Sequence, residues 1–369
     1  MLFASLTLIL SAGFTPPVAG ESILRGSPAP LDLSLPRHTR ALYLDAVGRT
    51  PDEGELELAT LGRPSLLLRT LCGSDEFWQQ WYEEELFYFL LVDNFRPEEK
   101  VQGEGIPEQL ASGELNLLNA VRAVVSSSAF NRANPGNDTF VSVVFEQLLG
   151  LTVQENPALL EAGKRMYDGE RASLWGMEGR GQADVVRIAC AQPEFAELIV
   201  SRQYERLVGH VPPRKQTERW SDQLREEPGC FPDLVREWLG SEAYAQRLKT
   251  LRRKSDRQFI RGLYVDLTGE PPSQDVMQRH RTALAAVADS GPLRSVIARV
   301  LLNSAGSGYG ERREPVEAAP LVRNLFLRFL GREPEPVELE GFSLVYEQCD
   351  CHPEILVRAV TTHQEYQYY

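Results

Sequence analysis

The sequence has few of the residues that build disulfide-rich, metal-binding or nucleic-acid-binding proteins. Its 369 residues include 5 cysteines and 5 histidines, too few cysteines for a disulfide scaffold. It has no Gly-x-Ser-x-Gly nucleophile motif, no His-Glu-x-x-His motif and no phosphate-binding loop. Positive charge is also scarce, because 39 lysines and arginines stand against 52 acidic residues and leave a net charge of -13. An acidic surface repels phosphate backbones, so we expect no nucleic-acid partner.

Long apolar runs are also lacking, with one exception at the N-terminus. "LFASLTLILSAGF" is a run of thirteen residues, which is too short to span a bilayer. Turn residues and the small residues Val18, Ala19 and Gly20 follow it and form a signal-peptidase site. Although no basic residue precedes the run, we interpret residues 1–20 as a signal peptide rather than a buried helix. We therefore expect an exported protein, periplasmic or extracellular, with no membrane span in the mature chain.

Two ten-residue stretches, more than 200 residues apart, have nearly the same letters: "LYLDAVGRTP" at 42–51 and "LYVDLTGEPP" at 263–272. Two relatives, "VFEQLLG" at 144–150 and "LFLRFLGREP" at 325–334, share the pattern, and we call these four stretches heads. Each has an aromatic residue five positions before its glycine, which is Gly48, Gly150, Gly269 or Gly331. Glycine tolerates the left-handed conformation that closes a helix, so each head predicts a helix end. In the first head, Thr50, Pro51 and Glu53 predict a capping box that starts the next helix.

A second pattern, which we call the tail, occurs at 68–77, 121–130, 186–195, 235–244, 298–307 and 357–366. Each tail has an arginine at its second position, and the arginines are Arg69, Arg122, Arg187, Arg236, Arg299 and Arg358. Eight residues later stands Phe77, Phe130, Phe195, Tyr244 or Tyr366, and only Ser307 breaks this rule. Apolar residues at helical spacing around each arginine predict a buried stripe. We expect the aromatic rings to be core residues, and a serine five positions after the arginine in four tails to cap a helix.

The tail arginines have two possible roles. An arginine beside an apolar stripe lays its stem on the core and pairs with a nearby carboxylate, for example Asp45 or Asp266 of the heads. The alternative is an array of arginines that binds acidic ligands. We favour the structural role.

Heads and tails alternate along the chain, and stretches that alternate apolar and polar residues are nearly absent. The fold class we predict is therefore all-α, with repeated helix–turn–helix units packed as a multi-domain helical array. Turn and charged segments divide it into helical repeat domains at 30–135, 138–250 and 256–369. Each unit alone leaves one apolar face uncovered, and only a neighbouring unit can cover it.

The residues also resemble a known family. "FIRGLYVDLTGEPPSQDVM" resembles the opening of an uncharacterised domain abundant in exported proteins of planctomycetes and related bacteria, often found with cytochrome-like modules. "LVDNFRPEEK", "NRANPGNDTFV" and "MYDGERASLWGMEGRGQADVV" are similar to other parts of that family, so the resemblance covers most of 37–205 and 256–369. It implies no activity, because none is established for the family. "LFLRFLGREPEPVELEGF" is similar to linker-type repeats with a leucine-glycine-arginine signature, which assemble other proteins.

The stretch "CDCH" at 349–352 is one candidate site. Covalent haem attachment places two residues between the cysteines, whereas only Asp350 separates Cys349 from Cys351, so we expect no haem. A metal site made of these thiols and His352 lacks a visible fourth ligand. A redox-labile disulfide, or thiols exposed between two helices, remains as the interpretation. We therefore predict no cofactor, no metal-ligating residue and no catalytic residue.

The second candidate is the segment 165–184, which we expect to be an irregular loop. Functional residues concentrate on loops, and this one contains Tyr167, Asp168, Trp175, Glu178 and Asp184. Its glycines, Gly176, Gly179 and Gly181, indicate a flexible connection, because no strand precedes them and no lysine-serine pair follows. It is the best candidate binding site that the sequence offers.

Two functions from different classes follow. The favoured function is an exported, non-catalytic helical repeat protein that binds another protein or a cell-surface component, or assembles the envelope or surface. The alternative is an exported enzyme or redox accessory protein that uses the 165–184 loop or the Cys349/Cys351 pair. The repeats, the export signal and the lack of a catalytic motif favour the first.

Overall fold

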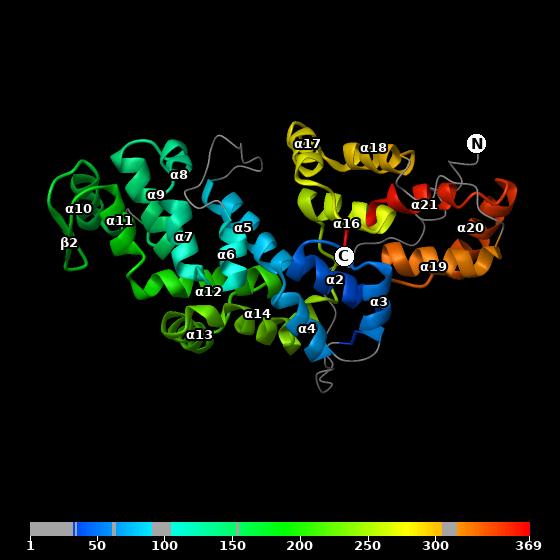
Figure 1. Cartoon of the computed structure of the whole chain (residues 1–369), viewed down its shortest axis with the longest axis horizontal. Coiled ribbons are helices and arrows are strands. Elements are labelled where there is room, and N and C mark those ends of the chain that lie inside the picture. The colour runs from blue at the N-terminus through cyan, green and yellow to red at the C-terminus, as the bar shows by residue number, and fades with distance from the viewer. Residues whose placement is uncertain (1–31, 34, 61–63, 91–104, 153–154, 305–315) are drawn as a thin grey trace. The chain divides into compact units, whose positions relative to one another are not determined.

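The computed structural model describes residues 32–33, 35–60, 64–90, 105–152, 155–304 and 316–369 (Figure 1). Within these residues the chain forms α-helices and short 3-10 turns, and its one sheet is a two-stranded hairpin. The prediction of an all-α fold is confirmed. The predicted signal peptide, residues 1–20, lies outside the described residues.

The chain folds into two compact units. Unit 1 combines residues 1–71 with 240–369, and unit 2 is residues 72–239. The first stretch of unit 1 contains α2 (Pro36–Val47), α3 (Glu53–Thr60) and α4 (Pro64–Cys72), whose last residue belongs to unit 2. Its second stretch contains α15 (Glu242–Arg247), α16 (Asp256–Thr268), α17 (Gln274–Ala285), α18 (Gly291–Leu302), α19 (Ala318–Leu330), α20 (Pro336–Gln348), α21 (Pro353–Thr361) and η3 (Gln364–Gln367).

Unit 2 is one continuous stretch of chain. Its elements are α5 (Asp75–Leu90), α6 (Ile106–Ser112), α7 (Leu117–Val125), α8 (Ser128–Ala133), α9 (Asn137–Leu149), α10 (Pro157–Tyr167), β1 (Ala172–Leu174), β2 (Met177–Gly179), α11 (Gln182–Ala189), α12 (Pro193–Val208), α13 (Arg214–Glu226), η2 (Pro228–Cys230) and α14 (Phe231–Leu239). Its core contains a cluster of edge-to-face and tilted aromatic rings around Phe231, including Trp78, Trp81 and Trp238. Such ring pairs contribute more stability than the burial of their apolar area alone would give.

These units differ from the three consecutive domains expected from the order of heads and tails. Helices α2 and α3 of the expected 30–135 domain belong to unit 1, whereas α5 to α8 belong to unit 2. The physical reason is pairing between the two stretches of unit 1. Gln258 Nε2 donates to the Leu44 carbonyl at 2.9 Å, and the Tyr369 hydroxyl donates to the Asp45 carboxylate at 2.7 Å. Such pairings between distant residues leave no local trace in the sequence.

The predicted helix ends are confirmed at all four heads. Each of Gly48, Gly150, Gly269 and Gly331 has φ between 66° and 81° and caps a helix in the left-handed conformation. Gly331 is also required by close packing, because a Cβ atom there would lie 2.7 Å from the Arg37 Cα. An alanine at this position would therefore combine backbone strain with a clash.

The predicted capping box at Thr50 is wrong. Thr50 is fully buried, and its hydroxyl donates to the Asp266 carboxylate at 3.0 Å. The box lies two residues later, where the Asp52 side chain accepts from the Glu55 N–H and Glu55 accepts from the Asp52 N–H, both at 2.8 Å. The sequence fits a capping box that starts at either Thr50 or Asp52. The Thr50 hydroxyl bonds to the buried Asp266 carboxylate of a distant head, so it does not cap the helix.

The tail aromatics are core residues, as predicted. Phe77, Phe130, Phe195, Tyr244 and Tyr366 are each at most 2% exposed. The capping prediction is confirmed for three serines, since Ser74, Ser127 and Ser241 accept the N–H of the aromatic residue three positions later. The fourth serine, Ser304, donates to the Leu301 carbonyl, and Ser307 lies outside the described residues.

Three of the six tail arginines pair locally, but not with the partners named from the sequence. Arg187, Arg236 and Arg358 each pair with a carboxylate three or four residues earlier on the same helix. Asp45 and Asp266 were the wrong partners. Both carboxylates point into the core of unit 1, where Asp45 pairs with Arg247 and Asp266 with Arg40. Helix periodicity explains the difference, because an arginine beside the buried stripe reaches the next turn of its own helix more easily than the core.

Candidate functional site

The segment 165–184 is a folded hairpin and not the irregular loop that we expected. Strands β1 and β2 pair antiparallel with Ala172 opposite Gly179, and in Figure 1 they lie beside α10 and α11. Trp175 (φ 46°) and Gly176 (φ 77°) form the two-residue turn, and two positive φ angles match the twist of a hairpin. The prediction failed because the strands are only three residues long, too short to show an alternating pattern.

The polar and aromatic side chains of this hairpin segment hold it against neighbouring helices. Asp168 accepts from Asn137 Nδ2 at 2.7 Å, and the Trp175 ring packs on Phe145 with centroids 5.2 Å apart. Asp184 accepts from the backbone N–H of Arg180 at 2.6 Å and from the Arg187 guanidinium. The Arg180 N–H, followed by the Arg187 guanidinium, lowers the pKa of the Asp184 carboxyl. The polar and aromatic residues that made the segment a candidate binding site therefore hold the hairpin in place.

Cys349 and Cys351 lie in the tight connection between α20 and α21. Asp350 and Cys351 adopt φ angles of 53° and 57°, and His352 precedes the first turn of α21. Both thiols are free and partly buried against the core of unit 1. In the described part of the chain, no group of three or more His, Cys, Asp or Glu residues is arranged for a metal ion.

Two of the other three cysteines, Cys72 and Cys190, occupy the same position in two tails, three residues after the arginine. Burial raises the pKa of the Cys72 thiol to about 12, and that of Cys190 also to about 12. A thiol that stays protonated at neutral pH is a poor nucleophile, so neither of these cysteines is a candidate catalytic residue.

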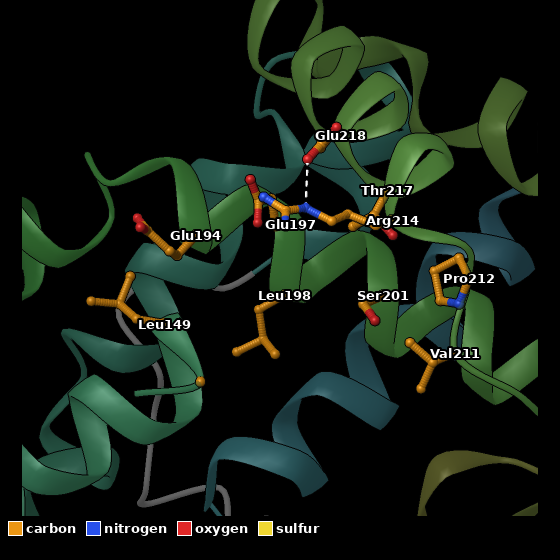
Figure 2. A pocket seen from close by; sticks show the side chains of 11 residues that line it. Leu149, Glu194, Glu197, Leu198, Ser201, Val211, Pro212, Arg214, Thr217 and Glu218 are labelled. Atoms are coloured by element: carbon orange, nitrogen blue, oxygen red, sulfur yellow. Dashed lines mark hydrogen bonds and ion pairs between the residues drawn. The ribbon is translucent and has the colours of Figure 1, made fainter. Parts of the chain in front are cut away.

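A candidate site lies in unit 2, in a cleft of about 440 Å³ that the sequence did not reveal (Figure 2). Helices α9, α12 and α13 and the α12–α13 connection form its walls. The lining residues are Leu149, Gly150, Glu194, Glu197, Leu198, Ser201, Val211, Pro212, Arg214, Thr217 and Glu218. All of them belong to one unit, so the shape of the cleft is fixed by packing within that unit.

Helix α12 supplies one wall. It begins with Pro193, a favoured first residue because proline has no N–H to satisfy and its φ is already helical. Glu194, Glu197, Leu198 and Ser201 recur at a helical spacing of three to four residues and share one face. The opposite face is buried in the core of unit 2, and it includes Phe195, Ile199 and Val200.

The opposite wall comes from the turn into α13. Gly209, with φ 86°, ends α12, and the chain then enters α13 through Val211 and two prolines. Trp220 and Leu224 bury the inner face of α13, which leaves Arg214, Thr217 and Glu218 toward the cleft. Val211 is 60% exposed although it is apolar. The cleft therefore presents apolar surface to solvent between rigid helical walls.

The charges around the cleft are mainly negative. Its lining contains three carboxylates, on Glu194, Glu197 and Glu218, and one cation, on Arg214. Arg214 Nε donates to Glu218 Oε1 at 2.8 Å. Helix α9 also ends at this cleft, and the carbonyl end of a helix carries partial negative charge. The electrostatic field of the site therefore favours a cation beside an apolar group.

A second cleft, of about 370 Å³, lies in unit 1 near the start of α18. Its lining is polar, and several of these groups bond to one another. Arg253 lies 4.0 Å from the Asp289 carboxylate, which accepts from the Gly291 N–H at 3.0 Å, and Ser295 donates to the Thr362 carbonyl. It lacks the exposed apolar surface of the cleft in unit 2, which we treat as the candidate site.

Sequence inspection could detect the parts of this site but not the site itself. The stretch "GHVPP" at 209–213 indicates a turn, and the glutamates of α12 indicate a polar helix face. Only the packing of α9 and α13 against α12 turns that face into a cleft.

In the described ranges, no helix has the length and apolar character needed to cross a membrane. In comparisons by sequence and by structure, no family model, curated protein or solved structure matches the chain.

Proposed function

We propose that this protein is an exported, non-catalytic helical repeat protein, and that it binds a segment of another protein in the cleft of unit 2. One observation carries the proposal: a cleft of about 440 Å³ joins exposed apolar surface to a rim of carboxylates on three helical walls. Export is supported by the apolar run and by the small residues at positions 18–20. The alternation of heads and tails supports a helical array as the scaffold.

The composition of the lining favours a protein segment over a small polar substrate. Protein interfaces combine an apolar centre with a polar rim. Here Leu149, Leu198 and Val211 provide apolar surface, while glutamates surround it. Grooves between helices bind peptide segments by accepting a few anchoring side chains. An exported array of helices that holds part of another protein fits this chemistry.

The rigidity of the walls favours specific binding. Helices α12 and α13 are packed on buried aromatic residues, including Phe195, Tyr204 and Trp220. The rings of Tyr204 and Trp220 pack in a tilted arrangement with centroids 5.3 Å apart, which connects the two helices directly. When a cleft is already formed in the free protein, little binding free energy is lost to the ordering of its side chains and backbone. The walls therefore keep their geometry while a partner segment enters.

A charged substitution in the apolar lining tests the proposal. Val211→Asp places a carboxylate where the partner's apolar side chain would pack, so we expect it to abolish capture of the partner from the extracytoplasmic fraction. Val300→Asp is the matched control, because Val300 is 62% exposed on α18 and lies in unit 1. Circular dichroism checks that both variants keep the helical content of the natural protein.

The captured protein is then purified and titrated against the natural protein and both variants. Loss of binding with Val211→Asp alone supports the cleft. Equal binding by Val211→Asp and the natural protein contradicts it, and loss with Val300→Asp alone places the contact on unit 1.

A further inference from the structure

We propose that the carboxylates of the unit 2 cleft form a cation subsite, where Arg214 pairs with Glu218 in the free protein and which a lysine or arginine of the partner segment takes over on binding. This inference rests on the proposed function and adds the chemistry of the partner: a basic residue next to an apolar one. In Figure 2 the Glu218 side chain points toward the Arg214 guanidinium. Its Nε donates to Glu218 Oε1 at 2.8 Å.

The position of Arg214 in its helix is unfavourable for the helix itself. Arg214 is the first residue of α13, Lys215 follows it, and the first turn contains no acidic residue. The N-terminal end of a helix carries partial positive charge and favours anions. The helix dipole therefore does not account for a cation here, whereas the pair with Glu218 does.

The contact that holds Arg214 is also weak enough to be replaced. The Arg214 side chain is 91% exposed, and Glu218 is four residues away on the same helix. Exposed pairs of this kind change an equilibrium constant by only about twofold. A partner cation that is anchored by neighbouring apolar contacts can therefore displace Arg214 at little cost.

The remaining charges determine which partner fits. With Arg214 displaced, Glu194, Glu197 and Glu218 all face the entering segment, and the carbonyl end of α9 adds to the negative field. Val211 lies within the same lining, and it can receive an apolar side chain beside the cation. An acidic segment is repelled. We therefore assign the occupant as an alternating apolar and basic segment of a protein.

The test titrates fluorescein-labelled pentapeptides against the full chain by fluorescence anisotropy. The probes are Leu-Arg-Leu-Arg-Leu and the matched Leu-Ser-Leu-Ser-Leu and Leu-Glu-Leu-Glu-Leu, all with blocked ends. We expect the arginine peptide to bind most tightly and the glutamate peptide least tightly. Arg214→Ala should tighten binding of the arginine peptide about twofold or more, because the internal competitor is gone. Glu197→Gln should weaken it several-fold.

Two control variants separate the subsite from general charge effects. Lys215→Ala removes one positive charge from the next residue of α13, which does not line the cleft. Glu205→Gln removes one negative charge from an exposed position of α12 away from the cleft. Both should leave the ratio of arginine-peptide to serine-peptide affinity unchanged. If Lys215→Ala tightens binding as much as Arg214→Ala, the subsite is overturned and only the net charge matters.

The outcomes also separate this inference from the proposed function. If the serine peptide binds as tightly as the arginine peptide and Val211→Asp abolishes both, the cleft binds segments without a cation subsite. In that case the inference fails and the proposed function stands. If no peptide binds and Val211→Asp still captures the natural partner, both fail. Tightening by Arg214→Ala, confined to the arginine peptide, supports both.

Discussion

The clearest prediction concerns the Tyr244 hydroxyl in the core of unit 1. Asp45 is 1% exposed, and its carboxylate accepts from the Tyr244 hydroxyl at 2.8 Å and from the Tyr369 hydroxyl at 2.7 Å. Arg247 balances its charge at 3.1 Å. Tyr244→Phe keeps the ring and removes one hydrogen bond to this carboxylate. Because the site is closed to solvent, water cannot easily replace the missing donor.

The magnitude follows from the charge of the acceptor. A hydrogen bond to a charged group contributes about 1.5–3 kcal/mol to the free energy of unfolding. Total stabilities are commonly about 5–15 kcal/mol, so the loss is a large fraction. With a urea slope of about 2 kcal/mol per M, a loss of about 2 kcal/mol lowers the denaturation midpoint by about 1 M. Tyr366→Phe should behave alike, because the Tyr366 hydroxyl donates to the buried Asp266 carboxylate at 2.7 Å.

Two optical signals separate the units in this experiment. All five tryptophans lie between residues 72 and 239, so tryptophan fluorescence reports on unit 2. Circular dichroism reports on the helices of both units. The part of the dichroism transition that the fluorescence does not follow therefore reports on unit 1. We expect Tyr244→Phe to lower the midpoint of that part and to leave the fluorescence midpoint unchanged.

Tyr264→Phe is the matched control. Tyr264 is half-buried and its hydroxyl lies 3.0 Å from His280 Nε2, so we expect a loss of about 1 kcal/mol or less. Equal midpoints for Tyr244→Phe and Tyr264→Phe would refute the claim that the buried carboxylate makes the difference.

Three further predictions concern the core, the pH dependence and the compartment. Phe195→Ala should cost about 3–5 kcal/mol in the fluorescence transition, whereas the adjacent surface change Glu194→Gln should stay within about 0.5 kcal/mol; equal effects would contradict a core role for the ring. Burial, followed by the charge of Arg40, lowers the pKa of Lys254 well below its usual value, so the unfolded chain binds an extra proton between that pKa and about 10.4. Lys254→Met should therefore raise the melting temperature at pH 7, with a gain that shrinks toward pH 10. A gain in melting temperature that is the same at both pH values would contradict the lowered pKa of Lys254. Finally, mass spectrometry of extracytoplasmic protein should find Glu21 as the first residue, and Met1 retained on cytoplasmic protein would disprove export.

Local features of the fold were predictable, and long-range ones were not. The head glycines, the tail aromatics and Ser74, Ser127 and Ser241 act through residues within a few positions, so their sequence pattern determines their structure. Thr50 failed because a buried carboxylate more than 200 residues away competes for its hydroxyl. The pairing of Asp45 with Tyr244 depends equally on distant residues.

The candidate site shows the same limit. The glutamates of α12 were visible as a polar face, but a polar face is ordinarily solvated surface. Its role as a cleft wall depends on where α9 ends and on how the chain turns at Val211. The hairpin at 172–179 was missed because each strand has only three residues. Short elements leave too little pattern for periodicity to detect.

The discontinuous path of unit 1 has a consequence for how the chain is made. Asp45 and Tyr244 belong to one core but are separated by the whole of residues 72–239. At about 5–20 residues per second, synthesis of the intervening segment takes on the order of ten to thirty seconds. During that time helix α2 exists without its partners from residues 240–369. The nascent chain therefore presents a helix whose residues Thr39–Val47 are buried only in the finished fold, for as long as unit 2 is being synthesised.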